Sequence, residues 1–236
     1  MIKTVPVTGS TNADLAARLA AGERITEGYW LVADRQSAGK GRHGRTWFDG
    51  AGNFMGSTVI HVGRCDPPAG TLALVAALAV AEAVTSYLAP PHRVVLKWPN
   101  DVLVGNAKLA GILLEMVGGS VIAGIGVNLK AAPVLSDRDT ATLAKFGAPP
   151  DRDLFAANLA SHLDAEVARW RVYGLEAVLA RWQALAHPAG TPLRIGEPGE
   201  ETLHGTFAGL AADGALQLRL ANGTTRTIHA GEVRLA

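Results

Sequence analysis

The stretch QSAGKGRHGRTW, residues 36–47, places three glycines, one lysine and two arginines between Gly39 and Arg45. Glycine lets the backbone approach a ligand closely and adopt positive φ angles. Arginine can hold a phosphate group through two parallel hydrogen bonds. The stretch therefore predicts a loop that closes over an anionic ligand, although such clusters also occur in solvated loops that bind nothing.

This glycine-rich loop does not belong to the common classes of phosphate-binding motif. Residues 39–44 match the dinucleotide pattern G-x-G-x-x-G, but that pattern has to open a helix and meet an acidic residue about 20 positions later. The residues that follow, TWFDGAGNF, are not a helical pattern, so the match is accidental and we do not expect a Rossmann fold. The sequence also lacks a P-loop and the HRD and DFG motifs of protein kinases.

Composition and charge limit the kind of protein this is. The formal net charge is +1, which argues against nucleic-acid binding, since that needs a strongly basic face. Cys65 is the single cysteine, so no intrachain disulfide can form, as expected in a reducing compartment. The N-terminus lacks an apolar signal core, and the most apolar run, residues 72–81, ends at Glu82, short of the roughly 20 residues of a membrane span. We expect a cytoplasmic protein with no membrane segment.

Hydrophobic patterns divide the 236 residues into a large mixed part and a small β part. The division falls near His187, after which short strands and the turn pairs Asp213-Gly214 and Asn222-Gly223 predict a small barrel. The expected helices are residues 11–21, 71–88 and 152–186, the last with a break near Gly174. The expected strands are 29–33, 53–62, 93–98, 108–116, 120–129, 191–195, 203–210, 216–220, 224–229 and 232–235.

Four further segments each allow a functional and an ordinary interpretation. The tripeptide STN at residues 10–12 is suited to capping a helix. The segment RVVLKWPND, residues 93–101, ends a strand with Asn and Asp, which suits either a ligand site or a turn. Lys108 opens KLAGILLE, in which Gly111 indicates a close approach by a ligand or another backbone. The segment GIGVN, residues 124–128, has the same character, and the histidines show no spacing typical of a zinc site.

Taken together and in order, these motifs resemble the biotin protein ligase family, and the resemblance covers nearly the whole chain. It implies an α/β (α+β) fold: a class II synthetase-like mixed sheet flanked by helices, followed by a small C-terminal SH3-like β-barrel. The implied domains are a catalytic biotin- and ATP-binding domain at residues 1–187 and the barrel at 188–236. Because only nine residues precede Ser10, we expect a short form without an N-terminal DNA-binding domain.

The resemblance also implies a reaction. Such ligases use ATP and Mg²⁺ to convert biotin to biotinyl-5′-AMP and then transfer biotin to a lysine of a carrier protein. Cations are needed where phosphate charge concentrates, and a cover must keep water from the reactive anhydride. The glycine-rich loop suits both needs, and we expect it to be mobile when empty and ordered by ligand.

The family motifs assign roles residue by residue. The implied catalytic residues are Lys108, which would bridge the biotin carboxylate and the α-phosphate, and Arg42. The implied biotin-binding residues are Ser10, Thr11, Asn12, Gln36, Lys40, Gly41, Arg42, Lys108 and Gly111. The implied ATP-binding residues are Arg42, Arg45, Trp47, Asn100, Asp101, Lys108 and Asn128, with Asp101 also near Mg²⁺. Lys40 stands where the family usually has arginine, so a point charge replaces a bidentate group there.

The implied partner is a biotin carboxyl carrier protein, or the carrier domain of a biotin-dependent carboxylase, with no DNA and no membrane partner. Two other functions fit parts of the pattern: a lipoate–protein ligase with the same acyl-adenylate chemistry, and a biotin-binding module without turnover. Either a monomer or a homodimer is compatible with the sequence.

Overall fold

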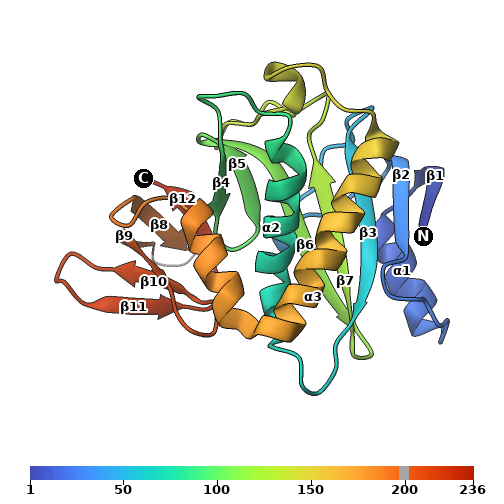
Figure 1. Cartoon of the computed structure of the whole chain (residues 1–236). Coiled ribbons are helices and arrows are strands. Elements are labelled where there is room, and N and C mark those ends of the chain that lie inside the picture. Colours follow the sequence, from blue (N-terminus) through green and yellow to red (C-terminus); the bar gives the residue numbers. More distant parts are fainter. Residues whose placement is uncertain (197–201) are drawn as a thin grey trace.

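The computed structural model describes residues 1–196 and 202–236, and its larger part is a seven-stranded sheet flanked by helices (Figure 1). The strand order is β1-β2-β3-β7-β6-β5-β4. Strands β1 and β2 are parallel, and the other neighbours in this sheet are antiparallel. The strands are β1 (Ile2–Thr8), β2 (Trp30–Gln36), β3 (Phe54–His61), β4 (Val94–Lys97), β5 (Asp101–Val104), β6 (Ala107–Val117) and β7 (Ser120–Val127).

Different helices cover the two faces of this sheet. Helices α2 (Leu72–Thr85) and α3 (Arg152–Leu185) lie side by side over one face, and α1 (Thr11–Ala20) packs on the other (Figure 1). Side chains along a strand alternate between faces. In β7, Val121 and Ala123 therefore join the core with α2 and α3, whereas Ile122 packs against Leu15 of α1. The even-numbered positions of β7 thus face α1.

Local sequence explains how the helices begin and bend. The Ser10 side chain caps α1 by accepting a hydrogen bond from the backbone N–H of Ala13 at 3.5 Å. Gly174 has φ 73° and interrupts α3 where the sequence predicts a break. The buried Glu166 carboxylate contacts Arg169 before this break and Arg181 after it, so an ion-pair cluster ties the two halves of the helix together.

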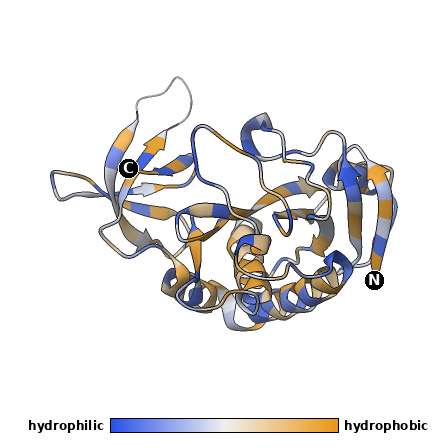
Figure 2. Ribbon diagram, turned by 90° about the horizontal axis from the view of Figure 1, so that it is seen from above, coloured by the Kyte–Doolittle hydropathy of each residue, from blue (hydrophilic) through white to orange (hydrophobic). Residues whose placement is uncertain are grey.

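The C-terminal segment forms a second, five-stranded antiparallel sheet in the order β11-β10-β9-β8-β12. Two contacts from the end of β4 hold it to the large sheet: Trp98 Nε1 donates to the Gly214 carbonyl at 3.1 Å, and Lys97 Nζ donates to the Val233 carbonyl at 2.9 Å. Seen from above, this sheet lies at the end away from the N-terminus (Figure 2). Its strands are β8 (Pro192–Gly196), β9 (Leu203–Leu210), β10 (Leu216–Arg219), β11 (Thr225–Ile228) and β12 (Glu232–Leu235).

The structure confirms the predicted mixed sheet with a small β unit after it, and it adds two strands that the sequence did not predict. Strand β1 was missed because its pattern is mostly exposed. Strand β5 was missed because Asn100 and Asp101 were placed at the end of the preceding strand, as either a ligand site or a turn. The division of the chain into domains at residue 187 stays a prediction. Among the described residues, no helix is both long enough and apolar enough to cross a membrane.

Candidate active site

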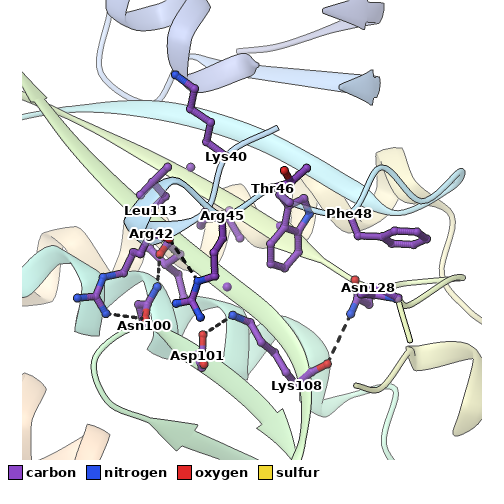
Figure 3. A pocket seen from close by; sticks show the side chains of 18 of the residues that line it. Lys40, Arg42, Arg45, Thr46, Phe48, Asn100, Asp101, Lys108, Leu113 and Asn128 are labelled. Carbon is purple, nitrogen blue, oxygen red and sulfur yellow. Dashed lines mark hydrogen bonds and ion pairs between the residues drawn. The ribbon is translucent and has the colours of Figure 1, made fainter. Parts of the chain in front are cut away.

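A cavity of about 510 Å³ lies on the α1 face of the large sheet and collects the sequence motifs (Figure 3). Its walls come from the start of α1, the glycine-rich loop, the β4–β5 turn, strands β6 and β7, the loop after β7, and β12. All the site residues implied by the family motifs line it: Ser10, Thr11, Asn12, Gln36, Lys40, Gly41, Arg42, Arg45, Trp47, Asn100, Asp101, Lys108, Gly111 and Asn128. The structure therefore brings these separate motifs to one place, although their individual roles stay predictions.

One part of the cavity is a hydrogen-bonding network of hydroxyl and amide groups that ends at the carboxylate of Glu115. The backbone N–H and the hydroxyl of Thr11 both donate to Gln36 Oε1, at 2.8 and 3.1 Å. The Thr11 hydroxyl lies 2.6 Å from Ser57 Oγ, which donates to Asn12 Oδ1 at 2.5 Å. The Asn12 amide in turn donates to Glu115 Oε2 at 2.6 Å. Sequence motifs predicted Thr11, Asn12 and Gln36, but not Ser57 or Glu115.

Glycines in β6 and β7 make room for two side chains of the site. A Cβ at Gly124 would lie 2.2 Å from Asn12 Oδ1, and a Cβ at Gly126 would lie 2.2 Å from the Trp47 ring. Gly111 pairs with Gly126 across the strands and lies under the same ring, where a Cβ would lie 3.0 Å from Trp47. The close approach predicted at these glycines is thus made by the protein's own side chains, which then face the cavity.

These contacts predict that two alanine substitutions will damage different parts of the site. In Gly126→Ala the Trp47 ring must move, and we expect ATP affinity to fall about tenfold, because the stacking that we predict between the base and this ring would be lost. In Gly124→Ala the Asn12 amide must move. We expect biotin affinity to fall about tenfold, because the hydrogen bonds that we predict between Asn12 and biotin would be lost. Calorimetric titration of both variants with each ligand checks this, each variant being the control for the other. Equal losses for both ligands in either variant would contradict the division.

Two buried polar atoms of the cavity wall indicate where a ligand with both donors and acceptors would fit. Among the described residues, no hydrogen-bond partner is present for Trp47 Nε1, a donor, or for Asn128 Oδ1, an acceptor. The Asn128 amide nitrogen is oriented by the Lys108 carbonyl at 3.5 Å. Buried polar groups without partners are costly, so both atoms favour a ligand that supplies them. The amino group of an adenine ring would supply the donor that Asn128 Oδ1 lacks.

A cationic cluster forms another part of the wall. Asp101 is buried and contacts two ammonium groups, Lys108 Nζ at 2.6 Å and Lys97 Nζ at 3.1 Å. Burial alone would raise the pKa of Asp101, but the charges of Lys108 and Lys97 outweigh it and hold that pKa at about 2. Burial lowers the pKa of Lys108 below its ordinary value, and the Asp101 carboxylate opposes this shift. Two cations share one anion here, so the cluster carries net positive charge beside the cavity.

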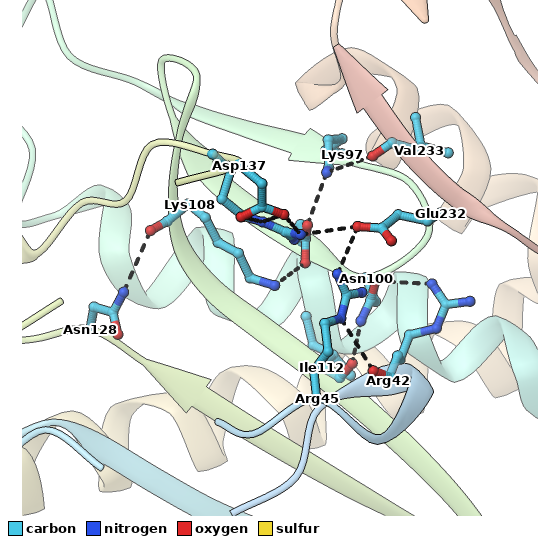
Figure 4. Close-up of polar contacts among 12 residues, drawn as sticks. Arg42, Arg45, Lys97, Asn100, Lys108, Ile112, Asn128, Asp137, Glu232 and Val233 are labelled. Atoms are coloured by element: carbon cyan, nitrogen blue, oxygen red, sulfur yellow. Dashed lines mark hydrogen bonds and ion pairs between the residues drawn. The ribbon is translucent and has the colours of Figure 1, made fainter. Parts of the chain in front are cut away.

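The glycine-rich loop folds as a short hairpin over this cluster. Backbone pairing between Lys40 and Thr46 closes it, together with a 2.6 Å hydrogen bond from Gly41 N–H to the Arg45 carbonyl. Arg42 Nη1 donates to Asn100 Oδ1 at 3.4 Å (Figure 4). Figure 3 shows Arg42 and Arg45 reaching toward the β4–β5 turn, whereas the exposed Lys40 side chain extends the other way. Lys40 therefore offers its backbone, rather than its charge, to the cationic part of the site.

We expect Arg42→Gly to release an activated intermediate prematurely. The substitution removes both a positive charge and the contact that joins the loop to Asn100, so the loop should hold phosphate less well. Rapid filtration after a single turnover would measure the fraction of intermediate that leaves the protein, which should rise about tenfold or more. Arg24→Gly, an exposed change outside the cavity, is the matched control. Retention equal to that of the unmodified protein would show that Arg42 does not hold the loop closed.

The described residues that line the cavity do not form a metal site made of protein ligands alone. Carboxylates that line the cavity are already paired with cations, Asp101 with two lysines, and Asp137 and Glu232 with arginines. Within residues 1–196 and 202–236, no group of three His, Cys, Asp or Glu side chains could hold a metal ion. Protein Mg²⁺ is often bound by one or two carboxylates together with substrate phosphates and water. The site fits Mg²⁺ carried on nucleotide phosphates, and Asp101 as a direct ligand stays a prediction.

The network of hydroxyl and amide groups and the cationic cluster share one cavity under the glycine-rich loop. This arrangement is suited to an enzyme that joins a small ligand to a nucleotide. Residues 6–131 match the model of the biotin/lipoate A/B protein ligase family, and residues 190–235 match the biotin protein ligase C-terminal domain. The chain therefore belongs to the biotin/lipoate A/B protein ligase family.

Individual relatives agree with this assignment over the whole chain. The biotin–[acetyl-CoA-carboxylase] ligase of Mycobacterium tuberculosis is 38% identical, with 98% of this chain and 88% of that protein covered. The enzyme of the same name from Paracoccus denitrificans is 37% identical, with 90% and 91% covered. The structure of the Aquifex aeolicus biotin protein ligase in complex with biotin and ATP superposes with a TM-score of 0.85 over 100% of this chain and 98% of that one, at 24% identity, which shows the shared fold.

Proposed function

We propose that this chain is an ATP-dependent biotin protein ligase that attaches biotin to a lysine of a carrier protein through biotinyl-5′-AMP. The observation that carries the proposal is the single cavity in which the network of hydroxyl and amide groups and the cationic cluster meet. This network suits the uncharged ureido head of biotin, with its one carbonyl and two N–H groups. Lys108 Nζ, 5.6 Å from the centre of the Trp47 ring and 2.6 Å from Asp101, stands between the proposed adenine and phosphate positions.

In the first step, a biotin carboxylate oxygen attacks the α-phosphorus of ATP. The bond from this phosphorus to the bridging oxygen breaks, and pyrophosphate leaves with the electron pair. Negative charge builds up around the α-phosphate in the transition state. Preorganised cations in a site shielded from water are the effective means of stabilising it. We assign this role to Lys108 and Arg42, and Lys108 has to be protonated to fulfil it.

In the second step, the neutral amine of a carrier lysine attacks the carbonyl carbon of the anhydride. The carbon–oxygen bond to phosphate breaks, AMP leaves, and the new amide nitrogen loses a proton. Water can attack the same carbonyl, so the intermediate has to be covered until the carrier arrives. The hairpin of residues 39–47, which closes one side of the cavity, is suited to that cover.

The decisive experiment measures pyrophosphate release from ATP with biotin and no carrier, and then adds a biotin carboxyl carrier domain. We expect one burst of pyrophosphate, followed by biotin on a carrier lysine detected by mass spectrometry. A parallel reaction with lipoate tests the other acid that the family accepts. Lipoyl transfer without biotinyl transfer would establish a lipoate ligase, and biotin binding without pyrophosphate release would establish a module without turnover.

The partner we propose is a carboxylase carrier, as named for the M. tuberculosis and P. denitrificans relatives. Absence of DNA binding, a cytoplasmic location and a monomeric or homodimeric state stay predictions.

A further inference from the structure

We infer that Arg138 is a further residue of the nucleotide site and that it binds the terminal phosphates of ATP, the part that leaves as pyrophosphate. The inference rests on the proposed function. Arg138 belongs to the loop between β7 and α3, outside every motif that the sequence presents. Its side chain lines the cavity and is 21% exposed, so it is accessible to a ligand without being a freely solvated surface group.

The backbone fixes this loop beside Lys108. Lys108 N–H donates to the Asp139 carbonyl, and Ala141 N–H donates to the Lys108 carbonyl, both at 2.9 Å. These two bonds pair the loop with the start of β6, and Arg138 directly precedes the paired residues. The positive charge of Arg138 also acts on Lys108. Burial lowers the pKa of Lys108 most, and the charges of Lys97 and Arg138 lower it further. Arg138 is therefore next to the residue that the mechanism puts at the α-phosphate.

Two arginines from distant parts of the chain meet at one carboxylate oxygen. Glu232 Oε1, on β12, lies 2.7 Å from Arg45 Nη1 and 3.0 Å from Arg138 Nη2. Figure 4 shows Arg45, Lys108, Asp137 and Glu232 converging on this region. The Glu232 oxygen occupies the position between the two guanidinium groups. A phosphate oxygen carries the same kind of charge and accepts the same hydrogen bonds, so it would bind beside Glu232, at the donors that this carboxylate leaves free.

Arg138 also has donors to spare. Asp137 accepts from Nε at 3.1 Å and from Nη2 at 2.5 Å, which orients the guanidinium plane. Among the described residues, the hydrogen bonds and ion pairs of Arg138 all use Nε or Nη2, so the two N–H groups of Nη1 are available to an added anion. A purely structural arginine tying β12 to the loop would need only the contact to Glu232. The oriented plane with donors left over fits a phosphate-binding role.

The test compares ATP with AMP, which lacks the terminal phosphates, by calorimetric titration without biotin, so that ATP is bound but not consumed. In Arg138→Ala we expect ATP affinity to fall about ten- to a hundredfold, as for loss of a charge-assisted contact, and AMP affinity to change less than about twofold. Arg234→Ala is the matched control: this arginine also faces Glu232, at 3.6 Å, but does not line the cavity. Its ATP affinity should stay within about twofold of the unmodified protein.

A second background separates phosphate binding from a structural role. If Arg138 acts only by holding Glu232, then in Glu232→Gln the further change Arg138→Ala will have no effect on ATP affinity. We expect the loss to persist in that background. Equal weakening of ATP and AMP, or disappearance of the loss in Glu232→Gln, would overturn the inference. Failure of the unmodified protein to release pyrophosphate would count against the proposed function instead, and the ATP and AMP titrations would still report on Arg138.

Discussion

Replacing Lys108 by alanine should slow pyrophosphate release on the order of 10²–10³-fold, by analogy with the loss of one preorganised transition-state contact. Lys108 reaches into the cavity from the start of β6, where Asp101 holds its ammonium group at 2.6 Å. The contact is made to charge that develops during the reaction, so the loss should fall on kcat more than on the KM for biotin. Quenched-flow measurement of pyrophosphate with saturating ATP and biotin checks this.

Two companions make the Lys108 result interpretable. Lys145→Ala removes an exposed lysine that does not line the cavity, and its rate should match that of the unmodified protein. Lys108→Arg keeps the charge with a different shape and should recover part of the rate. Adenylation at the unmodified rate in Lys108→Ala would show that another group, with Arg42 the first candidate, carries the transition-state charge.

Asp101→Asn should move the alkaline limit of activity to lower pH and destabilise the fold. Lys108 works only while protonated, so activity is lost as pH rises through its pKa. Burial already lowers that pKa, and the Asp101 carboxylate is what opposes the shift. Removing the carboxylate lowers the pKa of Lys108 further. The variant should therefore lose its ligase activity at a pH where the unmodified protein is still active. Leaving two partly buried ammonium groups without their anion should also cost about 3 kcal/mol of unfolding free energy.

The pH profile of kcat and a urea titration measure the two effects separately. Asp153→Asn, an exposed carboxylate paired with Arg152, is the matched control and should change neither. An unchanged alkaline limit in Asp101→Asn would mean that Lys108 is not the group whose deprotonation stops the reaction. In the unmodified protein, Asp101 has a folded pKa of about 2 against an ordinary 3.8, so its contribution to stability is complete above pH 3.8 and is lost as pH falls toward 2.

Most of the large sheet was predictable from local patterns. The short, almost continuously buried runs of β3 and β7, the apolar run of α2 and the glycine at 174 are local signals, and each produced the predicted element. Strand β1 carries no such signal because it is an exposed edge strand that exists through pairing with β2. Strand β5 is short and begins at Asp101, whose polarity suits a turn equally well. Strand pairing decided both: β1 pairs with β2, which lies more distant in the sequence, whereas β5 pairs with its sequence neighbours β4 and β6.

The sequence by itself determined the chemistry of this protein: which motifs are present, in what order, and hence the family and the cavity residues that those motifs supply. Only the tertiary structure decided which further side chains join them. Ser57 and Glu115 reach Asn12 through strand register, and Lys97 binds Asp101 across the β4–β5 turn. Arg138 and Glu232, 94 positions apart, form an ion pair that Arg45 also joins. The physical reason is that motifs record what one short segment does, whereas charge pairing at a site depends on distances between segments that only the folded chain sets.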